Sequence, residues 1–274
     1  MTATFTTTPD RAAESLLAFW SEAGVDAMLL DVPIDRIAAG AFVAPRPPER
    51  AAPSPAKTVA ARAGPDVSGA VAEARRLAAA AQDLDALKAA IDGFEGCPIR
   101  FEGAARQAVF SRGRPDAPLL IIGEGPGAEE DARGEPFVGR AGQLLDRMLA
   151  AAGLTDRVFI TNTVFWRPPG NRTPSPAEQM TCAPFVERAI ELVAPRMLLL
   201  LGAAAAKATL KREEGILSLR GRWFEWRSAD ESLELPAMPT LHPAFLLRQP
   251  AAKKKAWSDL MTLTERLDRP ERPA

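Results

Sequence analysis

The single histidine of this 274-residue chain, His242, stands in the stretch Leu-His-Pro-Ala-Phe-Leu-Leu-Arg. Imidazole is the side chain best suited to donate or accept a proton near neutral pH. Asn162 ends another apolar stretch, and its amide could pair with a ligand that offers both an N–H and a C=O group. Because a lone histidine often only satisfies a local hydrogen bond, its role depends on what the fold places around it.

A glycine-rich loop with four acids, Gly-Glu-Gly-Pro-Gly-Ala-Glu-Glu-Asp, occupies residues 123–131. Its glycines Gly123, Gly125 and Gly127 allow the backbone to approach a ligand closely. The loop lacks the Lys-Ser/Thr of a P-loop, and its acids would repel a phosphate. We therefore expect it to hold a neutral ring and a water molecule, with Phe137 in the next loop able to stack on that ring. A tight turn for the glycines and a core position for Phe137 are the alternatives.

Cations follow two of the apolar stretches. Arg167 and Arg172 flank a Pro-Pro-Gly-Asn segment, and such arginines on a stiff backbone suit contacts to phosphate. Arg248 follows Leu246 and Leu247, and an exposed apolar pair beside a cation resembles the wedges that enter DNA base stacks. These residues predict a nucleic-acid contact.

The elements that must position these residues are indicated by short apolar runs. The candidate strands are Leu119–Ile122, Val158–Thr161, Met197–Leu201 and Met238–Leu241, and the candidate helices between them are Ala141–Ala152, Ser175–Val193 and Ala203–Leu210. Runs that are apolar on both faces and alternate with helices predict a three-layer α/β/α sandwich with a central four-stranded parallel sheet. In such sheets the ligand binds at the carboxyl ends of the strands, where all of the motifs above lie.

Composition limits the class of protein. The chain is 47% hydrophobic and 25% charged, with a formal net charge of −1, which is typical of a soluble globular protein. No run approaches the roughly 18 apolar residues of a membrane span, and the N-terminal residues do not resemble a secretion signal. Two cysteines cannot form a disulfide framework. We expect a cytoplasmic protein without membrane contacts.

The chain is predicted to have three regions. Residues 1–42 form an N-terminal helical extension, residues 43–68 a Pro/Ala-rich linker, and residues 69–274 the main domain. The main domain includes a leading Ala/Leu-rich helix that extends from Ser68 to about Gly93. No activity is assigned to residues 1–93.

Six motifs taken together resemble the family 4 uracil-DNA glycosylases over residues 94–265. They are GEGPGAEED, GEPFVGRAGQLLDRML, ITN, RPPGNRTPSPAE, LLLLGAAAAKATL and HPAFLLR, in the order and with the spacing of that family. The resemblance implies the same sandwich fold. It also implies an enzyme that hydrolyses the N-glycosidic bond of uracil, with other deaminated bases as further candidates, and leaves an abasic site. The implied partner is uracil-containing DNA, single- or double-stranded, and we expect a bacterial-type monomer that acts at the nucleoid.

The resemblance also assigns roles by position. The implied catalytic residues are His242, Glu124 and Asn162; the base-binding residues are Gly123, Gly125, Gly127, Glu130, Phe137 and Asn162; the DNA-binding residues are Arg167, Arg172, Leu246, Leu247 and Arg248. Asn162 would read the N3–H and O4 edge of uracil, His242 would face O2, and Phe137 would stack on the base after it leaves the duplex. Donors at O2 and O4 would stabilise the negative charge on the departing base. No lysine lies in these motifs, so we expect a monofunctional enzyme.

Two departures from related enzymes concern water activation and metal. Gly125 stands where better-known glycosylases of the superfamily carry Asp, which leaves Glu124 to act through its carboxylate or its backbone. Family 4 enzymes hold an iron–sulfur cluster on four cysteines.

Only two of the four cluster positions hold cysteine in this chain. Cys97 and Cys182 match two ligand positions, and Phe94 and Trp166 occupy the other two. Two thiolates cannot hold a four-iron cluster, so we expect no cluster and no other cofactor. We expect the two aromatic side chains to fill the vacated volume.

Two other functions are considered beside the glycosylase. The missing Asp and cysteines would suit a catalytically weak protein that binds damaged or abasic DNA. A nucleotide-phosphate hydrolase on a doubly wound sheet is disfavoured by the acidic glycine loop. The range of bases stays open, because Gly127 stands where some relatives have Tyr and this chain contains no Tyr.

Overall fold

The computed structural model describes residues 67–269. The described residues belong to one compact unit. The predicted N-terminal extension and all but the end of the predicted linker therefore lie outside the described residues. The first described helix, from Val67, lies at the start of the described residues, and the predicted domain boundaries stay predictions.

A six-stranded sheet forms the middle layer. Its strands are β1 (Ser111–Gly113), β2 (Leu119–Gly123), β3 (Val158–Asn162), β4 (Met197–Leu201), β5 (Phe224–Arg227) and β6 (Glu234–Thr240). Their order is β1-β3-β2-β4-β6-β5, in which β3, β2, β4 and β6 are parallel and the two edge strands are antiparallel. The predicted parallel strands are present. The two edge strands were missed because each is short and only partly buried, and so lacks an apolar run.

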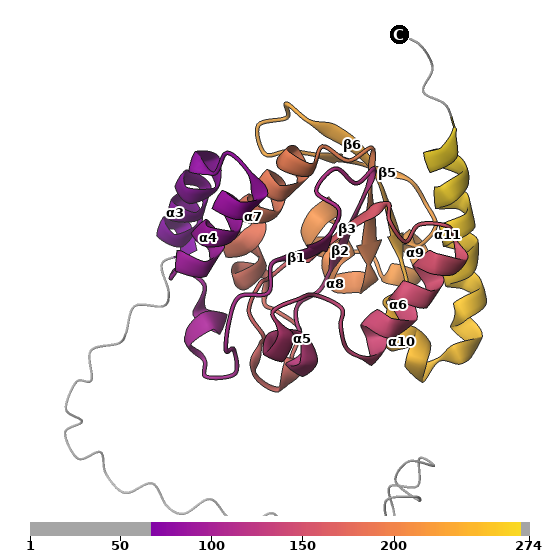
Figure 1. The fold of residues 1–274 in the computed structure, drawn as a ribbon, viewed down its shortest axis with the longest axis horizontal. Coiled ribbons are helices and arrows are strands. Elements are labelled where there is room, and N and C mark those ends of the chain that lie inside the picture. The colour runs from indigo at the N-terminus through magenta and orange to yellow at the C-terminus, as the bar shows by residue number, and fades with distance from the viewer. Residues whose placement is uncertain (1–66, 270–274) are drawn as a thin grey trace, which may run out of the picture. The chain divides into compact units, whose positions relative to one another are not determined.

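Helices cover both faces of this sheet, as Figure 1 shows. They are α3 (Val67–Ala80), α4 (Leu84–Gly93), α5 (Ala128–Arg133), α6 (Arg140–Ala151), α7 (Pro176–Val193), α8 (Gly202–Leu210), α9 (Ile216–Leu219), α10 (Pro243–Arg248) and α11 (Lys253–Asp268), with 3-10 turns η1 (Pro98–Phe101), η2 (Pro169–Asn171) and η3 (Pro250–Ala252). Along β2, Leu120 and Ile122 pack toward α3, α4 and α7, whereas Leu119 and Ile121 pack toward α6 and α11. This alternation confirms the three-layer sandwich.

The predicted leading helix is wrong as a single element. It divides into α3 and α4, which are separated by a short turn that includes Asp83. The Asp83 side chain accepts a hydrogen bond of 2.7 Å from the backbone N–H of Ala86 and so caps α4. An aspartate offers the free N–H groups of a new helix a partner, which favours a break at this point.

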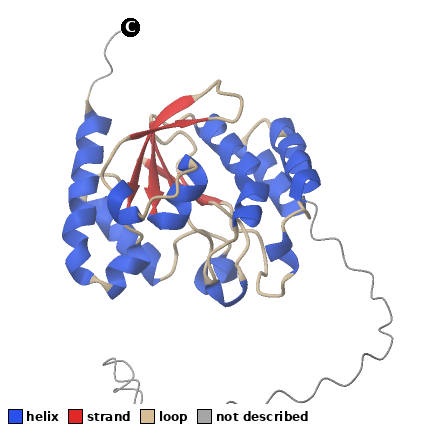
Figure 2. Cartoon of the chain, turned by 180° about the vertical axis from the view of Figure 1, so that it is seen from behind, coloured by secondary structure: helices blue, strands red, loops and turns tan. Residues whose placement is uncertain are grey.

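The carboxyl ends of the parallel strands meet at one edge of the sheet. Gly123 at the end of β2 is in register with Asn162 at the end of β3, and His242 follows β6 by two residues. The chain passes from β2 to β3 on one side of β2 and then from β3 to β4 on the other side. The order in which strands are added across the sheet therefore reverses at β2. Ligands of open α/β sheets bind at such a reversal. Figure 2 shows the strands, in red, between the helices that cover the sheet.

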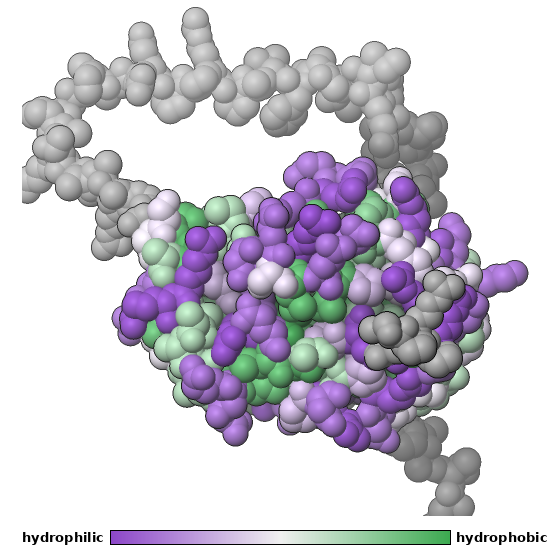
Figure 3. Space-filling model, turned by 90° about the horizontal axis from the view of Figure 1, so that it is seen from above, coloured by the Kyte–Doolittle hydropathy of each residue, from purple (hydrophilic) through white to green (hydrophobic). Residues whose placement is uncertain are grey.

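Hydrophilic side chains predominate on the face of the protein that Figure 3 draws. In Figure 3 purple hydrophilic side chains surround smaller green areas of apolar side chains on the face that is drawn. None of the described helices combines the length and the apolar character that crossing a membrane requires.

Candidate active site

A cavity of about 510 Å³ lies where the loops after β2, β3 and β6 meet. Eight of the residues singled out in the sequence line it: Glu124, Gly125, Gly127, Glu130, Phe137, Arg172, His242 and Arg248. Asn162 is not among the lining residues; its Oδ1 lies beside Gly123, as does the ring of Phe137, which does line the cavity. The fold thus brings together motifs that are more than a hundred residues apart in the chain.

The amide of Asn162 is fully buried, and neither Oδ1 nor Nδ2 has a hydrogen-bond partner among residues 67–269. A side chain at Gly123 would place its Cβ 2.4 Å from Asn162 Oδ1 and 2.5 Å from ring atoms of Phe137. Only glycine therefore lets the amide and the ring come together. An unsatisfied buried amide costs about 1–3 kcal/mol, so this position favours a ligand that presents a donor and an acceptor side by side.

His242 caps α10 and presents a single donor. Its Nδ1 accepts a hydrogen bond of 3.1 Å from the backbone N–H of Ala244. Desolvation, with the positive charge of Arg248 as second cause, lowers the pKa of His242 to about 4, although Glu130 acts in the opposite direction. The imidazole is therefore neutral at pH 7, and since Nδ1 is an acceptor, the proton is on Nε2.

Phe137 lies beside His242, with ring centroids 5.6 Å apart and an angle of 33° between the ring planes. Its backbone has a φ of 56°, a conformation that non-glycine residues rarely adopt. Arg112 on β1 holds this backbone: its Nε donates to the carbonyl of Pro136 at 2.8 Å and its Nη2 to that of Phe137 at 3.3 Å. The same Nη2 pairs with Asp146 at 2.6 Å. No pattern in the sequence singled out Arg112, because β1 was not predicted.

The carboxylate of Glu130 joins two of the pocket loops. It accepts hydrogen bonds from the backbone N–H groups of Gly127 at 3.1 Å, Val138 at 3.0 Å and Gly139 at 2.9 Å. These bonds fix the glycine loop against the loop that carries Phe137. Glu130 lines the pocket as predicted by position, and its geometry is that of a positioning residue.

The backbone around Glu124 is fixed by Thr163, which the sequence interpretation did not single out. Thr163 Oγ1 donates to the carbonyl oxygen of Glu124 at 2.6 Å, and its N–H donates to Gly123 at 2.9 Å. The Glu124 side chain lines the cavity and is partly exposed. This carboxylate is therefore open to a water molecule in the cavity.

The two predicted phosphate-binding arginines differ in their partners. Arg172 lines the cavity, but its guanidinium makes paired hydrogen bonds of 2.9 and 2.6 Å with Glu178 and one of 2.9 Å with Glu102. Arg167 makes a single hydrogen bond of 2.8 Å to the side chain of Asn171. Arg172 is thus largely neutralised within the protein, whereas Arg167 keeps its full positive charge.

The predicted exposed pair Leu246–Leu247 is wrong for Leu246. Leu246 is fully buried against Leu144, Leu241 and Ala256, since its position on α10 faces the protein interior. Leu247 is partly buried in the same cluster. Phe245 lines the cavity instead, next to Arg248. A helical period over Pro243–Arg248 could have separated the buried position from the exposed ones.

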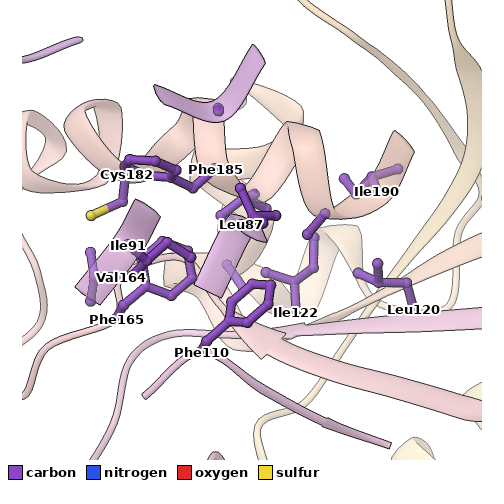
Figure 4. Close-up of a cluster of buried hydrophobic side chains, with 14 of the residues drawn as sticks. Leu87, Ile91, Phe110, Leu120, Ile122, Val164, Phe165, Cys182, Phe185 and Ile190 are labelled. Carbon is purple, nitrogen blue, oxygen red and sulfur yellow. The ribbon is translucent and has the colours of Figure 1, made fainter. Parts of the chain in front are cut away.

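A second buried cluster contains Cys97 and Cys182, and Figure 4 shows the part of it around Cys182. The sulfur atoms of Cys97 and Cys182 are 3.8 Å apart, and the hydrogen bond between them, together with burial, raises the pKa of the Cys182 thiol. The Phe94 ring lies 6.4 Å from Trp166 and 5.1 Å from Phe185, and these rings are at most 2% exposed. Within residues 67–269 no group of three or more His, Cys, Asp or Glu side chains is placed to hold a metal ion.

Comparison with known proteins agrees with this geometry. The model of the uracil DNA glycosylase superfamily matches residues 110–261. The type-4 uracil-DNA glycosylase of Pyrobaculum aerophilum is 38% identical over 183 residues, which cover 65% of this chain and 91% of the relative. Those of Thermotoga maritima and Sulfurisphaera tokodaii are 38% and 36% identical over 154 and 171 residues, or 56% and 60% of this chain and 77% of each relative.

Proposed function

This chain belongs to the uracil DNA glycosylase superfamily, and we propose that it removes uracil from DNA by hydrolysing the bond between the base and deoxyribose. The observation that carries the proposal is the unpartnered amide of Asn162 between Gly123 and Phe137. The N3–H of uracil would donate to Oδ1, and Nδ2 would donate to O4. Cytosine presents the opposite pattern at these positions, so the same amide orientation would reject it.

The neutral imidazole of His242 supports release of the base. When the bond between C1′ and N1 breaks, its electron pair remains on uracil, and the negative charge spreads to O2. A donor that is fixed in place and desolvated, as His242 is, stabilises that charge more strongly than a solvated donor does. The hydrogen bond from Ala244 to Nδ1 directs the Nε2–H into the cavity, where O2 would lie. Phe137, 5.6 Å away, provides the surface on which the base would stack.

Water completes the reaction at C1′. The oxygen of a water molecule would form the new bond to C1′, and one of its protons would be released while the uracil anion takes up a proton. Glu124 is the nearest candidate to orient that water, through its carboxylate or its backbone, because its carbonyl is fixed by Thr163. Since no lysine lines the cavity, we propose a monofunctional enzyme that leaves an abasic site.

Access of the base requires that it leave the stack of the DNA. Phe245 and Arg248 at the cavity rim, with the partly exposed Leu247, would face the gap, and Arg167 would contact a phosphate. Leu246 would support these residues from below rather than enter the DNA. We propose that the protein does this as a monomer in the cytoplasm, on uracil in single- or double-stranded DNA.

An oligonucleotide with one uracil tests the proposal. We expect free uracil and a strand that breaks only after treatment with alkali. The alternative, a protein that binds damaged or abasic DNA with little catalysis, is motivated by Gly125 in the place of a carboxylate. Binding without release of uracil would favour this alternative, and strand breakage without alkali would contradict monofunctional action.

The cavity also bears on the range of bases. A Cβ at Gly127 would lie 2.8 Å from Glu130 Oε2. As long as Glu130 holds the loop, residue 127 therefore has no room for a larger side chain. We propose that deaminated bases other than uracil are accepted to some degree. A panel of duplexes with single uracil, hypoxanthine or xanthine lesions measures this range, and release of uracil alone would contradict it.

We propose further that the chain holds no iron–sulfur cluster. The residues around Cys97 and Cys182 do not fit one, because the other two ligand positions carry Phe94 and Trp166, whose rings fill the space. A four-iron cluster needs four ligands. Protein purified without oxygen should contain almost no iron or sulfide, and near-stoichiometric amounts would contradict the proposal. The double variant Phe94→Cys, Trp166→Cys should bind more iron than the wild type or either single variant.

A further inference from the structure

A second, smaller cavity of about 340 Å³ lies outside the base pocket, and Phe101, Arg100, Arg106 and Trp166 are among its lining residues. We call it the flank cavity. Phe101 on η1 is 63% exposed, which makes it the most exposed aromatic side chain among the described residues. The largely buried Trp166 lines the same cavity. An exposed ring beside a hollow with an aromatic wall offers a surface on which a flat apolar group can stack.

The charges around the flank cavity are positive. The guanidinium of Arg100 lies 5.6 Å from the centroid of the Phe101 ring and donates to the carbonyl of Phe94 at 2.5 Å, which fixes its position. Arg106 is exposed, and its backbone N–H is held by Asp131 at 2.8 Å. The acid in the lining, Asp92, is paired with Lys88 at 2.9 Å. Two arginines are therefore available to an anionic partner.

Two connections place the flank cavity next to the base pocket. Arg172 lines the base pocket and bonds at 2.9 Å to Glu102, which follows Phe101 in the chain. On the other side, Asp131 holds the backbone of Arg106 and follows Glu130, which lines the base pocket. A strand whose base occupies the pocket would therefore have the flank cavity beside it on the same side of the protein.

We propose that the flank cavity binds an unpaired nucleobase of the same DNA strand, stacked on Phe101, with a neighbouring phosphate at Arg100 and Arg106. This inference rests on the proposed function, because it requires a strand with its uracil in the base pocket. Stacking on an aromatic ring accepts any base, and the arginines add a contact that weakens with salt. The site therefore favours substrates with unpaired bases beside the uracil.

Substitution of Phe101 tests the proposal. The probe is a single-stranded oligonucleotide with one 2′-fluorinated deoxyuridine, which resists hydrolysis, and affinity is measured by fluorescence anisotropy with the full chain. Phe101→Ala should weaken binding about tenfold, which corresponds to the usual contribution of one stacked base. Phe101→Trp should bind as well as the wild type. Met180→Ala is the matched control, because Met180 is 56% exposed on α7 outside both cavities and should leave affinity unchanged.

A spacer scan locates the stacked base. An abasic spacer is moved one position at a time along the oligonucleotide on both sides of the uracil. At one position the spacer should weaken wild-type binding and abolish the difference between the wild type and Phe101→Ala. If Phe101→Ala and the wild type bind every oligonucleotide with equal affinity, the proposal that the flank cavity binds a base is overturned. Uracil release from the unmodified strand by the wild type is measured separately. Absence of release would contradict the proposed function, whereas equal affinities with normal release would contradict only the flank cavity proposal.

Discussion

The amide of Asn162 and the cluster around Cys182 are both buried, but the two regions differ in how their buried atoms are partnered. In the pocket, an amide lacks partners, a phenylalanine has a positive φ, and a neutral histidine is withdrawn from water. Around Cys182 the neighbours are aromatic rings packed at 5–6 Å, and the two thiols contact each other. The pocket therefore holds its polar groups at a cost in stability, whereas the cluster contributes stability directly.

The largest effect should come from the cluster. Trp166→Ala removes a buried ring and should lower the free energy of unfolding by about 3–5 kcal/mol. Denaturant unfolding measures this change, and Trp257→Ala, at a tryptophan that is 39% exposed, is the matched control with a small effect. At saturating DNA, uracil release by the fraction of Trp166→Ala that remains folded should be nearly unchanged, although Trp166 also lines the flank cavity. A loss of turnover beyond the loss of folded protein would show that the two regions are coupled.

In the pocket, His242→Ala should lower the rate of uracil release about 10²–10³-fold, as expected for loss of one donor to a developing anion. DNA affinity should fall much less, and single-turnover kinetics beside anisotropy separates the two quantities. Equal losses in both would indicate a structural histidine. Asn162→Asp should weaken recognition of uracil, because a carboxylate cannot donate to O4.

The pKa of His242 predicts a pH dependence of stability. The unfolded chain takes up this proton near pH 6.5 and the folded chain only near pH 4, so the unfolded state binds more protons between these values. The contribution of His242 to the free energy of unfolding is therefore complete above pH 6.5. It decreases as the pH falls toward 4, by at most about 3 kcal/mol. The difference in unfolding free energy between the wild type and His242→Gln should follow this course. A difference that does not change with pH would contradict the lowered pKa of His242.

Arg112 connects the edge strand to the pocket, and its effect should be smaller. Arg112→Gln should reduce kcat/KM for uracil release about tenfold, because the carbonyls around Phe137 lose their charged donor. Arg112→Lys, which keeps a cation, should restore part of the activity. Arg114→Gln is the control, since Arg114 pairs only with the exposed Asp116 among its described neighbours. An equal loss in both glutamine variants would remove the positioning role.

The smallest effect concerns phosphate contacts. Arg167→Gln should weaken DNA binding on all sequences and reduce the slope of log K against log salt by about one. Arg172→Gln should change this slope less, because Glu178 and Glu102 already neutralise Arg172. Binding measured at several salt concentrations checks both, and unchanged slopes would exclude the arginines from phosphate contact.

Much of the fold followed from periodicity in the sequence. The four parallel strands and α6, α7 and α8 were predicted within a few residues of their observed bounds, because continuous apolar runs and the Ser175 cap of α7 are local signals. Edge strands β1 and β5 carry no such run. The division between α3 and α4 depended on the single side chain of Asp83, which competes with helix propagation.

Sequence alone determined which chemical groups are present: one imidazole, one strand-end amide, a glycine loop without a P-loop lysine, and two cysteines instead of four. Only the tertiary structure decided how they act. It left the amide of Asn162 without a partner, assigned Glu130 to three backbone N–H groups, buried Leu246 and brought Arg112 to Phe137. The physical reason is that burial and hydrogen-bond partnership depend on neighbours distant in the chain, which no local pattern specifies.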